Sequence, residues 1–204
     1  MKSVLVLALM LLSPAAMAGG SGDPTWPCIQ PKQPHLSIGQ LWPGPPPDDA
    51  VIGLARRPDI AALAQVLEQR RLPVEEAEAQ IAAFARGASA EELTALFVAV
   101  FDRIDAYRSR IMSGVARYAE KQMVLSDQIE ARRAEMTRLS AAAEPDFDRI
   151  DAEEARLDWD TRIFTDRQAQ LTYVCETPVI LEQRAFALGR AIAAHLPATP
   201  TPAP

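Results

Sequence analysis

Residues 90–142 contain no proline, and their only glycine is Gly114. Apolar residues recur every three or four positions along this stretch, which is the period of one face of an α-helix. We therefore expect one very long helix here, and a second long helix over residues 146–196, where the pattern is similar. At a rise of about 1.5 Å per residue, the first helix would be roughly 75 Å long. Because this exceeds the diameter of a small domain, we expect the two helices to fold back on each other as an antiparallel hairpin.

The spacing of apolar residues predicts a coiled coil along much of this hairpin. Four of them lie at the seven-residue period of a coiled-coil seam: Ile150, Leu157, Phe164 and Leu171. At the other end, around residues 93–101 and 179–192, the apolar faces broaden, and a broad face requires more than one neighbouring helix. Short helices within residues 48–86 are expected to pack there. The predicted fold class is all-α, with a long antiparallel coiled-coil helical hairpin, a small helical bundle at its base and a proline-rich extended N-terminal arm.

Local signals mark where the helices start and stop. The segment Ser89–Glu92 has the pattern of a capping box, which predicts that the first long helix begins immediately after Ser89. A shorter helix is expected from Pro58 to about Leu72, since proline is favourable in the first turn. Pro178 lies inside the second long helix and is expected to kink or break it, because proline removes a backbone hydrogen bond.

Residues 19–47 form a proline-rich arm, in which eight prolines disfavour helix and favour extended polyproline geometry. The arm also carries apolar residues, among them Trp26 and Trp42, that a solvated linker does not need. We interpret it as a strap over the helical domain of residues 48–196. The alternative is a free proline-rich ligand for a partner. Residues 197–204 are rich in proline and are expected to be a disordered tail.

The chain has two cysteines, Cys28 in the arm and Cys175 in the second long helix. In an oxidising compartment, an isolated pair of cysteines indicates a disulfide, and the alternative is two buried free thiols. A bridge would pin the arm along the second long helix. Because the loop that it closes is long, the chain-entropy argument gives a stabilisation of about 4–5 kcal/mol, less any strain.

The first eighteen residues have the pattern of a secretory signal peptide. Lys2 supplies a positive charge, and Val4–Leu12 is an apolar segment too short to span a bilayer. Ala16–Ala18 fits the small-x-small cleavage rule, so the mature chain is expected to begin at Gly19. No cysteine follows that position directly, which argues against a lipoprotein. We therefore expect a periplasmic protein, and the alternative is that the segment remains as an uncleaved anchor.

Charge and hydropathy narrow the possible partners. The formal net charge is -6, and loss of Lys2 with the signal peptide would make it -7. A basic footprint for nucleic acid is therefore missing from the sequence. No further apolar segment has the length needed for a transmembrane helix, so an integral membrane protein is not expected.

The acidic run at the start of the second long helix is the main candidate for a cation site. It does not fit a calcium-binding loop, because the sixth and twelfth positions from Asp146 are Asp151 and Leu157 in place of glycine and glutamate. We interpret the run as register-setting ion pairs with arginines of the first long helix. Those arginines are Arg132, Arg133 and Arg138, expected opposite residues 150–156.

Trp159 is the residue that departs most clearly from the apolar pattern of the second long helix. In the heptad defined by Leu157 and Phe164 it falls at the outward position, away from the other long helix. Aromatic residues at such positions often anchor protein interfaces. We therefore predict a partner-binding surface formed by Trp159 and its acidic neighbours, which are Asp151, Glu154, Asp158 and Asp160. The alternative is that the arm or a second copy of the chain covers Trp159.

Catalytic motifs are missing from the sequence, which lacks the serine-hydrolase, zinc-protease and phosphate-loop patterns. Its two histidines, His35 and His195, have no evident partners, so no catalytic residues, metal or cofactor are predicted. We expect a non-enzymatic module that presents its hairpin to an envelope protein. The alternatives are a periplasmic holdase-type chaperone and a helical binder of small molecules or cations. A homodimer is also possible, with the long helices pairing between chains.

Overall fold

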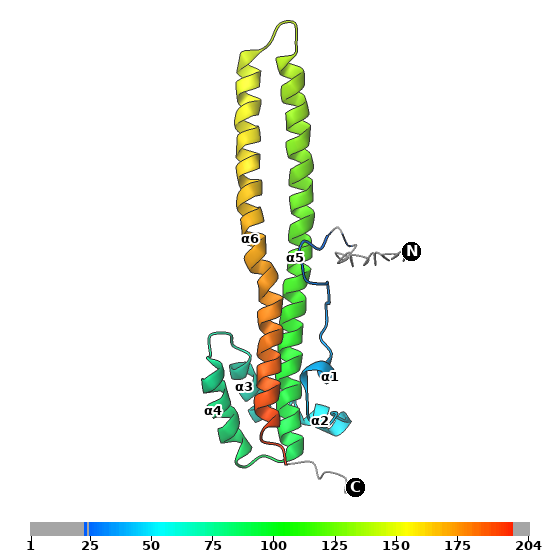
Figure 1. The fold of residues 1–204 in the computed structure, drawn as a ribbon, viewed down its shortest axis with the longest axis vertical. Coiled ribbons are helices and arrows are strands. Elements are labelled where there is room, and N and C mark those ends of the chain that lie inside the picture. The colour runs from blue at the N-terminus through cyan, green and yellow to red at the C-terminus, as the bar shows by residue number, and fades with distance from the viewer. Residues whose placement is uncertain (1–22, 24, 198–204) are drawn as a thin grey trace, which may run out of the picture.

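The structure is a computed structural model that describes residues 23 and 25–197, and all the regular secondary structure in them is helical (Figure 1). The elements are α1 (Ile38–Leu41), α2 (Asp49–Leu54), α3 (Pro58–Leu67), α4 (Val74–Ala85), α5 (Ala90–Ser140) and α6 (Phe147–Ala193). The predicted signal peptide, the first residues of the predicted arm and the predicted tail beyond Pro197 lie outside the described residues.

The two long helices begin at the residues that their capping signals indicate. The Ser89 hydroxyl accepts from the backbone N–H of Glu92 at 3.2 Å, and the Glu92 carboxylate accepts from the backbone N–H of Ser89 at 2.8 Å. This reciprocal pair is the predicted capping box. At the start of α6, the Asp146 carboxylate accepts from the backbone N–H of Arg149 at 3.1 Å. The helices end two and three residues before the predicted ends, at Ser140 and Ala193.

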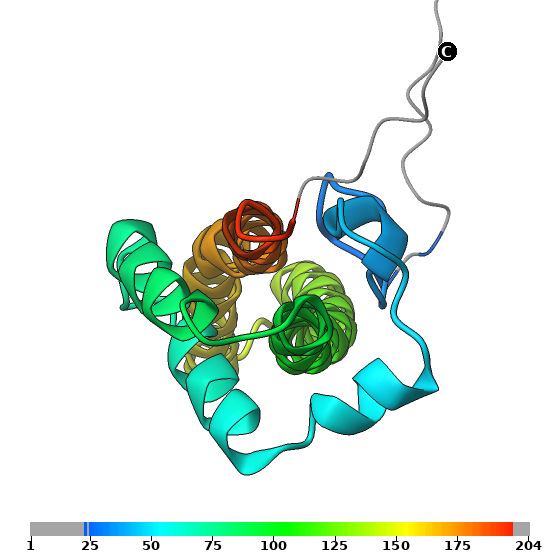
Figure 2. The same ribbon diagram turned by 90° about the horizontal axis from the view of Figure 1, so that it is seen from below.

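The long helices α5 and α6 pack against each other, and the chain reverses between them in residues 141–146 (Figure 1). The short helices gather around one end of the pair, as Figure 2 shows from below. There α2 and α3 pack on α5, whereas α1 and α4 pack on α6. Beyond this base, the upper parts of α5 and α6 run on with only each other as helical neighbours (Figure 1).

The hydrophobic core lies at the base, where the apolar faces were predicted to broaden. Trp42 of the arm stacks on Phe97 of α5 with 4.5 Å between the ring centroids. Gly189 of α6 lies so close to the arm that an added Cβ would be 2.6 Å from the Leu41 carbonyl oxygen. The core also contains fully buried aliphatic residues of both long helices and of α3 and α4: Ile60, Leu67, Ile81, Leu96, Val100, Leu181, Leu188 and Ile192.

The arm contains a helix that the sequence pattern did not predict. Proline was expected to exclude helix throughout residues 19–47, and this is wrong at α1. Residues 35–42 form a stretch without proline between Pro34 and Pro43, so one turn can close there. The turn buries Leu41 in the core at the base.

Pro178 does not break α6, which is continuous on both sides of it. The axis of the helix bends in the orange part of Figure 1. Pro178 itself is buried, and the buried residues Leu171 and Leu181 hold the helix on either side. Packing of these neighbours offsets the cost of the hydrogen bond that proline cannot make.

Candidate interaction surfaces

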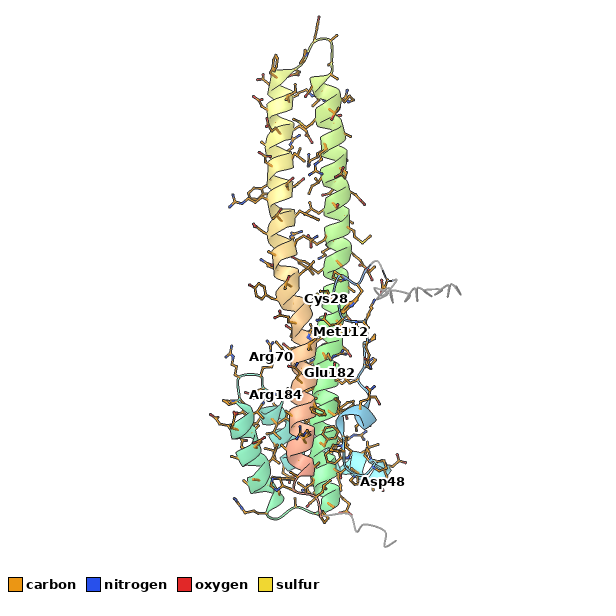
Figure 3. All side chains as sticks on the ribbon, in the orientation of Figure 1. Cys28, Asp48, Arg70, Met112, Glu182 and Arg184 are labelled. Atoms are coloured by element: carbon orange, nitrogen blue, oxygen red, sulfur yellow. A yellow bond between two sulfur atoms is a disulfide. The ribbon has the colours of Figure 1, made fainter. Side chains whose placement is uncertain are left out.

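The predicted disulfide between Cys28 and Cys175 is present and joins the arm to α6, with 5.5 Å between the two Cα atoms. Cys28 and Met112 lie together at mid-height in Figure 3. Both belong to a second buried cluster with Trp26 and Val115. The arm is therefore packed where it is crosslinked, as a strap requires.

Polar side chains of α5 hold the arm below the disulfide. The buried Arg108 guanidinium donates to the Gln33 carbonyl. The Asp105 carboxylate accepts from the backbone N–H of Leu36 at 2.7 Å and contacts His35 Nδ1 at 2.9 Å. The strap was expected along the second long helix, but these polar contacts attach it to α5. It thus links both long helices, since the disulfide reaches α6.

One group of side chains has the residue types of a hydrolase catalytic triad but not its geometry. It consists of His35, Asp105 and Ser109. The Asp105 carboxylate and the Ser109 hydroxyl contact the same ring atom, His35 Nδ1, at 2.9 and 3.3 Å. A catalytic triad requires the acid and the nucleophile to contact opposite ring nitrogens. The Ser109 hydroxyl also donates to the Pro34 carbonyl, so its contact holds the strap.

Trp159 lies on the outward side of α6, as the heptad pattern predicted, and 62% of its surface is exposed. The predicted acidic neighbours divide into two groups. Asp151, Glu154 and Asp158 are exposed. The side chain of Asp160 is only 18% exposed, because it faces α5 and forms an ion pair there.

Arg132 of α5 is the cation that binds the acidic run. Its Nε lies 2.7 Å from Asp160 Oδ2, and its Nη1 lies 2.7 Å from Glu153 Oε1. Hydrogen bonding from Arg132 lowers the pKa of Glu153, and the two carboxylates raise the pKa of Arg132. One guanidinium therefore fixes two positions of α6, a full heptad apart, against α5.

The other two register pairs predicted from sequence are wrong. Arg133 pairs with Glu130 and Arg138 pairs with Glu135, both within α5. Glu135 also lies 3.6 Å from Arg149 of α6, so an ion pair does cross the helices near the turn. The charges on that pair are reversed from the prediction, with the acid on α5 and the base on α6.

Trp159 shares its side of α6 with two other exposed apolar residues. Tyr173 is 74% exposed and Ile180 is 44% exposed. Because they follow Trp159 by fourteen and twenty-one residues, all three occupy the same position of the seven-residue repeat. We call Trp159, Tyr173 and Ile180 the outer stripe of α6.

A cleft lined by arginines was missed by sequence reasoning. It lies between the turn after α3 and the side of α5, has a volume of about 810 Å³, and is lined chiefly by Glu68, Arg70, Arg71, Arg103, Tyr107 and Arg110. Two features of the sequence could have indicated this cleft. Arg103, Tyr107 and Arg110 have the spacing of one helix face, and Arg70 and Arg71 are consecutive arginines. Tyr107 is three residues after the buried Ile104, at the spacing of an apolar helix face, yet 39% of it is exposed.

The described residues offer no cluster of metal ligands. No three His, Cys, Asp or Glu side chains in them gather closely enough to hold a metal ion. Over the same residues, no helix combines the length and the apolar character that crossing a bilayer requires.

Comparison of the chain with protein-family models, with curated proteins and with solved structures gives no match. Its function therefore has to be inferred from its own side chains.

Proposed function

We propose that this chain is an exported, non-enzymatic interaction module that presents a coiled-coil hairpin to a protein of the bacterial envelope. The observation that carries the proposal is the exposure of Trp159 in the first third of α6. Large aromatic residues dominate the energetics of protein interfaces, and the fold itself does not bury this one. The disulfide supports an oxidising compartment such as the periplasm, in agreement with the predicted signal peptide.

The contacts between α5 and α6 support the coiled-coil part of the proposal. Leu125, Ile129 and Leu171 are buried along the pair away from the base. Polar contacts add positional specificity. Gln122 donates to the Phe164 carbonyl at 3.3 Å, and the Tyr118 hydroxyl donates to the Arg167 carbonyl at 3.1 Å. A narrow seam that mixes apolar and polar contacts suits a helical rod that displays its outer surfaces.

The charges around Trp159 indicate the chemistry of the partner. Asp158 precedes the tryptophan directly, and Asp151 and Glu154 are exposed one to two turns before it. The neighbouring Arg156 is engaged by Glu153, with 3.2 Å between the charged atoms, and one exposed arginine, Arg162, follows Trp159 by about one turn. We therefore infer an envelope protein that offers an apolar pocket for the indole, with basic side chains at the rim.

The test is substitution of Trp159 by alanine, with Val124→Ala as the matched control. Val124 is an exposed apolar residue of α5, with 56% of its surface accessible. Crosslinking and mass spectrometry on envelope extracts would identify the partner, and the purified pair would then be titrated. Loss of a central aromatic residue costs about 2 kcal/mol or more, so we expect W159A to weaken the complex roughly 30-fold or more.

V124A should leave the affinity unchanged, and Asp158→Lys should weaken association most strongly at low salt. Equal affinities for W159A and the parent chain would remove Trp159 from the interface. Sedimentation of the purified protein separates this outcome from self-association. A dimer that W159A dissociates would identify the partner as a second copy.

A further inference from the structure

The arginine cleft is a second surface that the proposed interaction of α6 does not use. It lies at the base of the molecule, between α5 and the α3–α4 turn that carries Arg70 and Arg71. Figure 3 labels Arg70 beside this turn, at the upper edge of the short helices that surround the base. Trp159 belongs to the upper part of α6, so the two surfaces can be varied separately.

The charge of the cleft is opposite to that of the whole chain. Four arginines and a single carboxylate, Glu68, line it, although the chain has a net charge of -6. Glu68 is already engaged by Arg103, with 2.6 Å between Oε1 and Nη2. The guanidinium of Arg110 lies 5.8 Å from the centre of the Tyr107 ring. Arg70 and Arg71 are exposed and therefore keep their full donor capacity for a ligand.

One donor at the cleft is also unsatisfied. Arg103 Nε is buried from solvent and has no hydrogen-bond partner. A buried donor without a partner costs free energy.

The turn that forms one wall is fixed in place. Arg184 of α6 donates from Nε and Nη2 to the Leu67 carbonyl at 2.9 and 2.7 Å, and from Nη1 to the Leu72 carbonyl at 2.9 Å. These bonds clamp both ends of the segment that carries Arg70 and Arg71. The ion pair between Glu68 and Arg103 ties the same segment to α5. The backbone that carries Arg70 and Arg71 is therefore already in place before a ligand binds, which reduces the entropic cost of binding.

We propose that this cleft binds a compact, multiply charged oxyanion of the phosphate class. A guanidinium matches phosphate with two parallel hydrogen bonds, and neighbouring guanidiniums favour a ligand with more than one negative charge. The cleft is far larger than a single phosphate group, so the anion can belong to a larger molecule. Two sources share this chemistry, a free phosphorylated compound and the phosphomonoester headgroup of a lipid.

The experiment uses the mature chain with its disulfide intact and pyrophosphate as the probe. Calorimetry at low ionic strength would compare the parent chain with Arg70→Gln/Arg71→Gln. The charge-matched control is Arg162→Gln/Arg167→Gln, two exposed arginines of α6 outside the cleft. Circular dichroism would verify that both double variants keep the helical content of the parent.

We expect one pyrophosphate per chain, an affinity at least tenfold weaker in R70Q/R71Q, and no change in the control. Vesicles of phosphatidylcholine with and without phosphatidic acid then separate the sources. Binding only to the vesicles with phosphatidic acid, abolished by excess pyrophosphate, would assign the lipid headgroup. Binding of pyrophosphate without vesicle binding would assign a free anion.

The proposal is overturned if neither pyrophosphate nor the vesicles bind, or if both double variants weaken binding equally. A synthetic acidic peptide with the sequence of residues 144–160 would be titrated in the same way. If this peptide binds, pyrophosphate does not, and R70Q/R71Q abolishes peptide binding, the ligand of the cleft is an acidic protein segment and the oxyanion proposal is wrong. None of these results depends on whether Trp159 contacts an envelope partner.

Discussion

Arg184 shows how one buried side chain can decide where a helix ends. The apolar pattern predicts a helix from Pro58 to about Leu72, but α3 ends at Leu67. The last carbonyls of a helix have no partners within it. Arg184 supplies donors to the Leu67 and Leu72 carbonyls, which satisfies the end of α3 and the turn after it. Burial lowers the pKa of Arg184, because desolvation disfavours its charged form.

We predict that Arg184→Met destabilises the base although methionine fills similar space. The substitution leaves the Leu67 and Leu72 carbonyls without their donors, and a buried acceptor without a partner costs about 1–3 kcal/mol. Urea unfolding should show a loss of about 2–3 kcal/mol. Arg86→Met, at an exposed arginine next to α4, is the control and should change stability little. Equal midpoints for the two variants would contradict this role of Arg184.

At the scale of the helix pair, Arg132 makes the contacts between α5 and α6 away from the base sensitive to acid. Its hydrogen bond lowers the pKa of Glu153 below the ordinary value of 4.5. A carboxylate whose pKa is lower in the folded state contributes stability above its unfolded pKa. That contribution is lost as the pH falls through the folded pKa. The contacts between α5 and α6 should therefore weaken in the range below about pH 4.5.

We expect Arg132→Gln to remove this pH dependence. Thermal unfolding at neutral pH should show a lower Tm for R132Q than for the parent, because Glu153 and Asp160 lose their shared cation. The difference in Tm should shrink as the pH falls from 5 to about 3, since protonation disables the same contact in the parent. A constant difference across this range would show that Arg132 acts through packing alone.

The elements differ in how far the sequence could predict them. Absence of proline and the capping box at Ser89 were enough to locate α5, because both act within the local backbone. It was harder to predict which residues of α5 face which residues of α6, because this register depends on the length and geometry of the turn at residues 141–146. The predicted ion pair of Arg132 with α6 is present, whereas Arg133 and Arg138 form ion pairs with acids one turn away in α5 itself.

At the scale of the whole molecule, the disulfide joins the arm to the helix pair. We predict that Cys28→Ala/Cys175→Ala lowers the stability of the chain by up to about 5 kcal/mol, because 147 residues separate the cysteines and loop-closure entropy grows with this length. The long helices should remain, so circular dichroism should change little. Trp26 is buried beside the bridge, and its exposure should shift the fluorescence to the red.

A matched measurement uses the parent chain with and without reductant. Limited proteolysis should cut the arm near Cys28 in the reduced chain before it cuts α5 or α6, because the bridge that joins this segment to α6 is then lost. If Trp26 stays protected and the stability of the double variant equals that of the parent, the arm is held by its packing and by its polar contacts with α5.

The candidate sites also differ in how far they could be predicted. The outward position of Trp159 follows from a local repeat, so the sequence was sufficient. The arginine cleft joins two segments, and Glu68 and Arg103, which meet there, are 35 residues apart. Only the packing of α3 on α5 brings them together, and a linear pattern does not specify that packing.

The position of the two cysteines imposes an order on the assembly of the chain. Cys28 is synthesised long before Cys175, because 147 residues separate them, so this bridge cannot form until most of the chain has been made. In the folded chain, packing of the arm and α6 beside α5 brings the two sulfurs together. A thiol-trapping assay during synthesis would thus report when the arm has joined the helix pair.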